Sequence, residues 1–216
     1  MVKVVYDPRE NQRLLEARVD ELRTKLDHVD PNLLAARTDV QYEHSEAGVS
    51  LFRVPFFGRE IKVTHPDYQA FDSQTGETEN VANQAMIIYH FVTSDGTLLA
   101  NEWIAFSELP DGRFYNLAFQ GYTGREIVAA LGGDLRAFEV AAENSGGRRA
   151  HFFGDVAYQY QLLPRVPLMV VFWAGDDDFP SSVQILFDAS IGHHLPTDAC
   201  AIAGSMLTRR IIKAGG

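Results

Sequence analysis

Three adjacent carboxylates lie in the C-terminal third of the sequence, at Asp176, Asp177 and Asp178. They follow a strongly apolar run and Gly175, so they belong to a loop at the end of an expected strand. Carboxylates this close together repel one another, and a divalent cation bound through their oxygens would relieve the repulsion. A solvated acidic turn is the ordinary interpretation of such a run, and a metal site at Asp176 and Asp178 is the functional alternative. The spacing does not match the alternating acids of a calcium-binding loop.

A second polar group follows the next expected strand. Asp188 comes at the end of that strand, and His193 and His194 follow in the same loop. Loops at the ends of strands often carry catalytic or binding side chains. A histidine in such a loop can act as a general base, an orienting group or an axial ligand. His193 and Asp188 are therefore candidate catalytic residues, and His193 and His194 are candidate cofactor ligands. A turn cap for Asp188 and a structural hydrogen bond for the histidines are the alternatives.

Aromatic side chains are concentrated between Leu98 and Tyr122. Aromatic residues this dense either fill a core or form the wall of a pocket for a flat ligand. We expect a pocket between this stretch and the C-terminal strands, with Asp188 and the acidic turn at its rim. The cofactor-binding candidates from the aromatic residues are Trp103, Phe106, Tyr115 and Trp173. A haem or a corrinoid would suit such a wall, with His193 as its main polar contact.

The composition narrows the class of protein and its partners. A formal charge of −10 and the lack of a long basic run argue against nucleic acid and anionic lipid as partners. No apolar run approaches the length of about 20 residues that a membrane-spanning helix needs, and the N-terminus lacks the apolar stretch of a secretory signal. The single cysteine, Cys200, excludes an internal disulfide and is expected to be a small buried residue. We therefore expect a cytoplasmic protein.

Familiar catalytic motifs are missing from the sequence. It contains no G-x-S-x-G, no H-E-x-x-H, no paired cysteines and no dinucleotide-binding glycine pattern. The segment Gly132-Gly133-Asp134 lacks the preceding strand and the Lys-Ser/Thr pair of a phosphate-binding loop. These absences give no support to acyl transfer, zinc proteolysis or dinucleotide chemistry.

Helices and a small sheet are expected in the first half. A helix over residues 8–28, capped by Asp7, carries an apolar stripe that serves either its own domain or a homodimer seam. The stripe consists of Leu15, Val19, Leu22, Leu26 and Val29. A short helix over 30–37 and an antiparallel meander over 40–65 follow, with Pro55 at an edge or a bend. A buried helix over 79–93 then carries His90 as a core or boundary histidine.

The second half combines helices and strands. Helices capped by Thr123 and Asp134 are expected to run to Leu131 and to about Asn144, and strands are expected over 156–162, 168–173 and 183–187. The strand over 168–173 is apolar on both faces and should be central. A last helix, capped by Thr197, should run to about 212. Because no strand–helix–strand unit repeats, we expect an α+β fold with antiparallel or mixed sheet regions and packed helices. It should form one compact domain, 1–216, divisible into a helical and meander subregion, 1–76, and a core, 77–216.

Two stretches of the sequence resemble a known family. NEWIAFSELPDGRFYNLAF and LPRVPLMVVFWAGDDDFPSSVQILFDASIGHHLPTDACAIAG are similar to the signature stretches of an uncharacterised bacterial and archaeal family, the domain of unknown function numbered three-seven-eight-six. The resemblance extends from the first helix to the last. It makes His193 the histidine that matches the family pattern, and His194 a departure from an aromatic residue. Some relatives carry an iron–sulfur module with cysteine ligands, which this chain lacks. The family implies no settled activity.

Three functions are compatible with these residues. The leading expectation is a protein that binds a small ligand or cofactor, such as a haem or a corrinoid, in the aromatic pocket. The first alternative is a metal-dependent hydrolase or lyase that uses His193 as its base. The second is an interaction protein that dimerises through the apolar stripe of the first helix.

Overall fold

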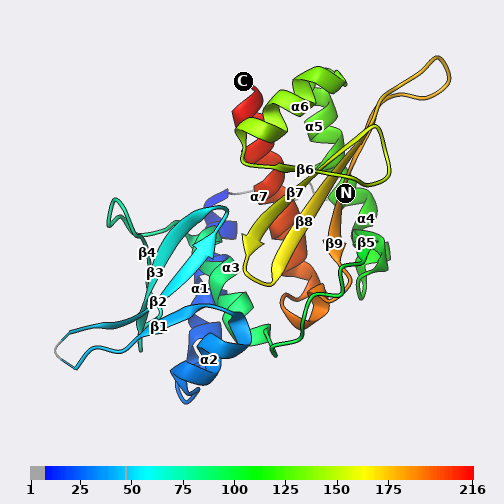
Figure 1. The fold of residues 1–216 in the computed structure, drawn as a ribbon. Coiled ribbons are helices and arrows are strands. Elements are labelled where there is room, and N and C mark those ends of the chain that lie inside the picture. The colour runs from blue at the N-terminus through cyan, green and yellow to red at the C-terminus, as the bar shows by residue number, and fades with distance from the viewer. Residues whose placement is uncertain (1–7, 47) are drawn as a thin grey trace.

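Two antiparallel sheets and the helices packed against them make up the fold (Figure 1). The computed structural model describes residues 8–46 and 48–216. The α-helices are α1 (Pro8–Thr24), α2 (Pro31–Thr38), α3 (Val81–Thr93), α4 (Gly112–Gly121), α5 (Gly124–Leu131), α6 (Leu135–Asn144) and α7 (Thr197–Gly215). The short 3₁₀ helices are η1 (Phe106–Glu108) and η2 (Ile191–His193). Among the described residues, no helix has the length and apolar character needed to cross a membrane.

The first sheet is a meander of the strands β1 to β4, in chain order: β1 (Gln41–Glu43), β2 (Ser50–Phe56), β3 (Arg59–His65) and β4 (Ala70–Asp72). The β2–β3 hairpin turns at Phe57 and Gly58, which both have positive φ angles. Every second residue of β2 points into the core, and Phe52 meets Phe91 of α3 at a ring-centroid distance of 5.1 Å. Alternation along the strand thus turns one face of this sheet toward α3.

The second sheet has the order β5-β9-β8-β7-β6, and its strands are β5 (Trp103–Ala105), β6 (Arg148–Ala150), β7 (Val156–Leu163), β8 (Val166–Trp173) and β9 (Ser182–Asp188). The expectation of a central strand over 168–173 is confirmed, because β8 lies in the middle of the sheet. One face packs on helices, with Phe172 stacked 5.0 Å from Phe138 of α6. Figure 1 shows α7 behind this sheet and α5 and α6 at its upper end.

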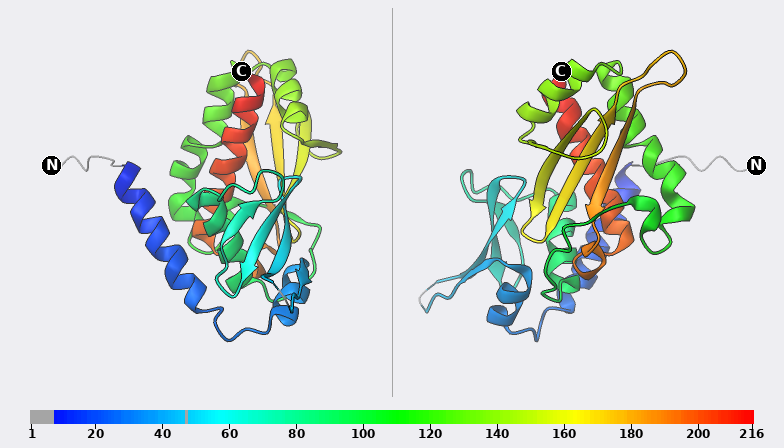
Figure 2. Two further views of the ribbon diagram at one scale, coloured as in Figure 1. Left: turned by 90° about the vertical axis from the view of Figure 1, so that its left-hand side faces the viewer. Right: turned by 45° about the vertical axis from the view of Figure 1, so that its right-hand side comes forward.

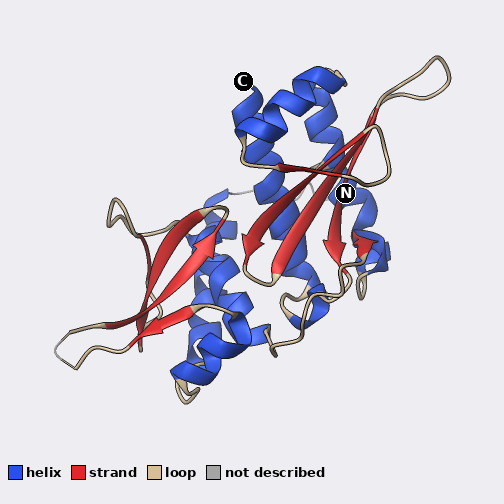
Figure 3. Ribbon diagram, viewed as in Figure 1, coloured by secondary structure: helices blue, strands red, loops and turns tan. Residues whose placement is uncertain are grey.

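The two sheets share one continuous core. Helix α3 contacts both α1 and α7, so it lies between the two halves of the chain (Figure 2). The turn after β2 also reaches the second sheet, where the Phe57 amide donates to the Leu162 carbonyl at 3.0 Å. Figure 3 shows the strands gathered in two separate groups with helices between and behind them. The expected α+β class with antiparallel sheets and packed helices is confirmed.

Several local expectations need correction. The meander expected over 40–65 extends further, because the polar segment after His65 contains the short strand β4. Thr197 does not cap α7, because its hydroxyl donates to the Pro110 carbonyl and the helix begins at Thr197 itself. Thr123 likewise donates to the Phe119 carbonyl instead of capping α5. In contrast, Asp134 caps α6 as expected. The expected cap at Asp7 lies outside the described residues.

The apolar stripe of α1 packs inside its own chain. Val19, Leu22 and Leu26 are buried in the core, and α1 contacts α3. Leu15 and Val29 are partly buried against the same core. The described fold therefore uses the stripe for intramolecular packing, and the stripe offers no exposed seam for a dimer.

Candidate functional site

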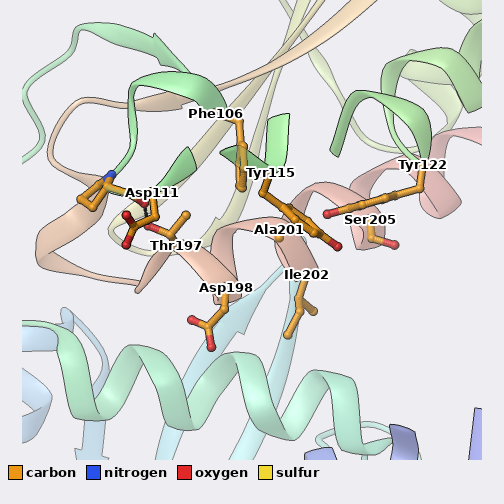
Figure 4. A pocket seen from close by; sticks show the side chains of 10 residues that line it. Phe106, Asp111, Tyr115, Tyr122, Thr197, Asp198, Ala201, Ile202 and Ser205 are labelled. Carbon is orange, nitrogen blue, oxygen red and sulfur yellow. Dashed lines mark hydrogen bonds between the residues drawn. The ribbon is translucent and has the colours of Figure 1, made fainter. Parts of the chain in front are cut away.

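A large cavity lies between the aromatic stretch and α7 (Figure 4). Its volume is about 860 Å³, which is within the range of small-molecule sites. We call it the aromatic groove, and its lining residues are Phe106, Pro110, Asp111, Tyr115, Tyr122, Thr197, Asp198, Ala201, Ile202 and Ser205. The sequence predicts a pocket beside the aromatic stretch, but the opposite wall is α7 and not the C-terminal strands.

Three aromatic side chains form one wall of the aromatic groove. Phe106 is buried and stacks on Phe119 of α4, with ring centroids 4.1 Å apart and planes inclined by 10°. Tyr115 follows on α4, where half of its surface stays exposed, and its ring lies 6.2 Å from that of Tyr122. Burial, with a smaller contribution from Tyr115, raises the pKa of the Tyr122 phenol above its usual value. The wall is therefore anchored in the core at Phe106 and open to a ligand at Tyr115.

Helix α7 supplies the facing wall with small side chains. Thr197, Ala201 and Ser205 recur at intervals of four residues, so they lie on one face of the helix. Their small volume leaves room between α4 and α7. The hydrogen bond from Thr197 Oγ1 to the Pro110 carbonyl, 2.9 Å long, ties the two walls together at one end of the groove.

Two carboxylates give the aromatic groove its polar character. Asp111 precedes the first turn of α4, and Asp198 lies in the first turn of α7, where the helix dipole favours a negative charge. Asp198 Oδ2 accepts a hydrogen bond of 3.2 Å from the Tyr89 hydroxyl of α3. Figure 4 shows Asp198 and Ile202 pointing toward that helix. The groove can thus hold the apolar part of a ligand, and its two carboxylates can accept hydrogen bonds from the polar groups of that ligand.

The second sheet separates the predicted aromatic residues into two sets. Phe106 and Tyr115 line the aromatic groove on the helix-covered side. Trp103 and Trp173 pack instead against Met169 and the neighbouring apolar residues on the opposite face. Successive residues of a strand point to opposite faces, so Trp103 and its neighbour Ile104 belong to different sides of the sheet. The structure therefore does not bring the two tryptophans to the groove.

The two adjacent histidines have opposite environments. His194 points inward, is fully buried and places Nδ1 2.9 Å from the Ser94 hydroxyl. Burial lowers its pKa, and the charge of Arg165 acts in the same direction. His193 is exposed, and its Nδ1 lies 2.8 Å from Asp95 Oδ2. Hydrogen bonds from His193 and Thr97 hold the pKa of Asp95 well below its usual range. Neither histidine lines the aromatic groove.

Asp188 clamps the chain at the end of β9. Its Oδ1 accepts hydrogen bonds from the Ala100 amide and from the amide and hydroxyl of Ser190, and its Oδ2 accepts one from the Asn101 amide. Burial acts to raise its pKa, but the hydrogen bonds from Ser190, Ala100 and Asn101 outweigh it and lower the pKa. A carboxylate this fully engaged serves to hold the 94–102 segment on the strand. It lies outside the aromatic groove.

The acidic turn forms around Asp176. Its Oδ1 accepts hydrogen bonds from the amides of Asp178 at 2.9 Å and Phe179 at 2.8 Å, which lower its pKa. The side chains of the turn are exposed. In residues 8–46 and 48–216, no group of three or more His, Cys, Asp or Glu side chains is arranged to hold a metal ion. Metal binding by Asp176 and Asp178 stays a prediction.

The groove residues that the sequence did not single out as ligand-binding lie mainly on α7 and at its approach. In the sequence, Asp198 indicates only a favourable charge in the first turn of a helix, and Pro110-Asp111-Gly112 indicates only a turn. A signal was present in the small residues at 197, 201 and 205, because a small-residue stripe on an otherwise half-exposed helix indicates a close neighbour or a cavity. Cys200, as expected, is buried.

Comparison with known proteins adds the family and nothing on activity. Neither the curated proteins nor the solved structures contained a significant match. A family model, described as a domain of unknown function (DUF3786), matches residues 30–210. The match includes both stretches on which the resemblance rests, and it covers both sheets and most of α7. The chain belongs to the DUF3786 family of domains of unknown function.

Proposed function

We propose that this protein, which we place in the cytoplasm from its composition, binds a small and largely apolar ligand in the aromatic groove. The observation that carries the proposal is a cavity of about 860 Å³ with an aromatic wall on α4 and a wall of small side chains on α7. Sites for small molecules combine such apolar surface with a few convergent polar groups. Here those groups are the carboxylates of Asp111 and Asp198.

The lining restricts the chemistry of the ligand. Two carboxylates favour a ligand whose polar groups are neutral donors or cations, and they disfavour a polyanion. A flat aromatic body would stack on Tyr115 or Tyr122. If the ligand is a haem or a corrinoid, the groove offers tyrosine hydroxyls as axial ligands, since His193 lies outside it.

A direct test uses the neutral, flat dye Nile red, whose fluorescence rises in an apolar site. The wild-type protein should bind it saturably. Tyr115→Ala removes exposed aromatic surface and Ile202→Trp fills the cavity, so each should weaken binding by about tenfold or more. The matched control is Phe114→Ala, because Phe114 is 90 % exposed and does not line the groove. Equal losses in Phe114→Ala and Tyr115→Ala, or no saturable binding, would refute the proposal.

Titrations with haemin and hydroxocobalamin separate the groove from a second candidate site. The exposed pair of Asp95 and His193 has the geometry of a base held by an orienting carboxylate, which favours the hydrolase or lyase alternative. Spectral shifts that Tyr115→Ala weakens and His193→Ala leaves unchanged support the groove. Shifts that only His193→Ala abolishes, or a stabilisation by Mg²⁺, Mn²⁺ or Zn²⁺ that Asp95→Asn removes, would assign the ligand to the histidine instead.

A further inference from the structure

A second cavity lies where the two sheets meet, and we call it the joint pocket. It is lined by the β2–β3 turn of the first sheet, the loop after α6, the start of β6, the middle of β7 and Arg210 of α7. Its volume is about 360 Å³. β6 pairs with β7 only as far as Gln159, and the edge of β7 beyond that residue faces the β2–β3 turn. The joint pocket therefore opens beside a strand edge, between parts of the chain that are far apart in sequence.

Arg210 is fixed in the joint pocket but has no ionic partner. Its Nε donates to the Ser145 carbonyl at 2.6 Å, and its guanidinium lies over the Phe57 ring at 5.2 Å from the centroid. In the described part of the chain it forms no salt bridge, and its terminal nitrogens make no hydrogen bond. Burial lowers its pKa, and the charge of Arg59 acts in the same direction. The terminal nitrogens are not among the buried polar atoms of the described residues, so this oriented, half-buried guanidinium is accessible to an anion that enters the pocket.

Arg148 brings a second positive charge to the joint pocket. It lies directly opposite Gln159 in the β6–β7 register, so both side chains share one face of the sheet. No salt bridge to Arg148 occurs among the described residues, and the described lining of the pocket contains no aspartate or glutamate. The neighbouring Arg149, by contrast, pairs with Glu139 at 2.9 Å.

Other arginines near the β2–β3 hairpin have carboxylate partners. Arg59 pairs with Asp72 at 2.8 Å and also with Glu79. Arg53 pairs with Glu43 and Glu60. In a chain with 29 acidic and 19 basic residues, carboxylates are plentiful. Two arginines that face one cavity without a carboxylate partner in residues 8–46 and 48–216 mark this cavity as a site for an anionic ligand.

We propose that the joint pocket binds a small molecule through an oxyanion group, a phosphate or a carboxylate, held by Arg210 and Arg148. The guanidinium fork matches either group with two parallel hydrogen bonds. Gly146, which has a positive φ angle, lies beside Arg210, since a Cβ atom there would be 3.5 Å from Arg210 Nη2. The cavity is larger than a bare anion needs, so the oxyanion is part of a larger molecule. Such a ligand would contact both sheets at once.

Calorimetric titration at constant ionic strength tests this, with inorganic phosphate in one arm and succinate in the other. The wild-type protein should bind at least one of them saturably, and the arm that responds identifies the oxyanion. Arg210→Gln and Arg148→Gln should each weaken binding by about tenfold or more, because each removes a charged hydrogen-bonding partner. Arg209→Gln and Arg149→Gln change the same net charge next to the pocket and should leave the affinity unaltered.

Two results would overturn the proposal. One is the lack of saturable binding of either anion to the wild-type protein up to about 50 mM, a range in which ligand stabilisation is still measurable. The other is an equal loss of affinity in the pocket variants and in Arg209→Gln and Arg149→Gln. If Arg210→Gln fails to fold because it loses the bond to Ser145, the exposed Arg148→Gln variant decides the question.

Discussion

His90 and His194 lie buried beside each other behind the loop that carries the histidine pair. Their ring centroids are 6.1 Å apart, and neither side chain is accessible to solvent. His90 Nε2 lies 3.3 Å from the Thr38 carbonyl, while His90 Nδ1 and His194 Nε2 have no hydrogen-bond partner in the described residues. Burial is the main reason that the pKa of His90 falls to about 4, and repulsion from Arg165 and from His194 in its protonated form adds to it. We infer that both rings are neutral at pH 7.

This burial predicts a loss of stability in mild acid. The unfolded chain takes up a proton on His90 near pH 6.5, whereas the folded protein resists it until about pH 4. Stability is therefore full above pH 6.5 and decreases as the pH falls toward 4, by roughly 3 kcal/mol from His90 alone. Urea unfolding of the wild type and of His90→Gln between pH 7 and pH 4 measures the difference. Glutamine keeps an amide donor for Thr38 and does not titrate, so its stability should depend less on pH.

The exposed His28 provides the control for this measurement. The stability of His28→Gln should depend on pH as that of the wild type does, because an exposed side chain is not desolvated on folding. The carboxylates that titrate in the same range are present in both proteins and contribute equally to the two curves. If His90→Gln lost as much stability between pH 7 and pH 4 as the wild type, the buried histidine would not be the source of the acid sensitivity.

Sequence reasoning located the histidine loop but could not orient its side chains. His193 and His194 lie at the end of the 3₁₀ turn η2, where neither the period of a strand nor that of an α-helix assigns a side chain to a face. Tertiary contacts decide the direction of each side chain instead. His194 forms a hydrogen bond with Ser94, and His193 forms one with Asp95. Those partners lie about a hundred residues earlier in the chain, beyond the reach of any local pattern.

The helices and strands with a clear apolar period were predictable. The α1 stripe, the β2–β3 hairpin and the central strand β8 all follow from regular spacing of apolar residues. The strand β4 was missed because three residues in a polar segment carry no measurable period. Helix α4 was not expected as a helix, because its aromatic residues were interpreted as pocket or core without an assigned element.

The contact between α4 and α7 depends on a glycine. A Cβ atom at Gly204 of α7 would come within 2.5 Å of the Phe119 ring, which stacks on Phe106 in the aromatic groove. Gly204→Ala should therefore destabilise the protein by about 1–3 kcal/mol from overpacking, partly offset by about 1 kcal/mol of helix propensity. It should also weaken Nile red binding, because α4 has to move. Chemical denaturation and dye titration measure the two effects.

Gly121 of α4 is the matched control, since it is helical as well and a Cβ atom there would meet nothing within 4 Å. Gly121→Ala should keep or slightly raise the stability and leave dye binding unchanged. A neutral effect of Gly204→Ala on both measurements would show that the two helices are not in tight contact at this point.

The two sheets should unfold together. One core cluster extends from Val19 in α1 to Ile211 in α7, and α3 contributes to both halves. Trp103 and Trp173 both belong to the second sheet, so their fluorescence reports on the 77–216 core, whereas far-ultraviolet circular dichroism reports on helices of both halves. Coincident urea transitions by the two probes are expected for a single cooperative unit.

A tryptophan placed in the first sheet gives an independent probe of the 1–76 subregion. Tyr42→Trp introduces it beside Phe52, where the side chain is partly buried. Its transition should coincide with the other two. A separate transition of this probe would show that residues 1–76 form an autonomous domain.

The aromatic groove could be anticipated only in part, for a reason that concerns the whole molecule. The residue types of the 98–122 stretch indicated a pocket wall, and Phe106 and Tyr115 do line the cavity. The facing wall comes from α7, almost a hundred residues later. The element that covers the aromatic residues is determined by the topology of the sheet and by the face on which the helices pack. The local spacing of residues in the sequence contains no information on either.

Helix α7 is constrained along nearly its whole circumference. One side lines the aromatic groove through Thr197, Ala201 and Ser205, and another is buried in the core through Ala203, Leu207 and Ile211. Arg210 reaches the joint pocket from a third side. Among its later positions, Arg209 and Lys213 are exposed. Natural variation in this helix should therefore concentrate at those two positions, while most other changes would alter a cavity, the core or both.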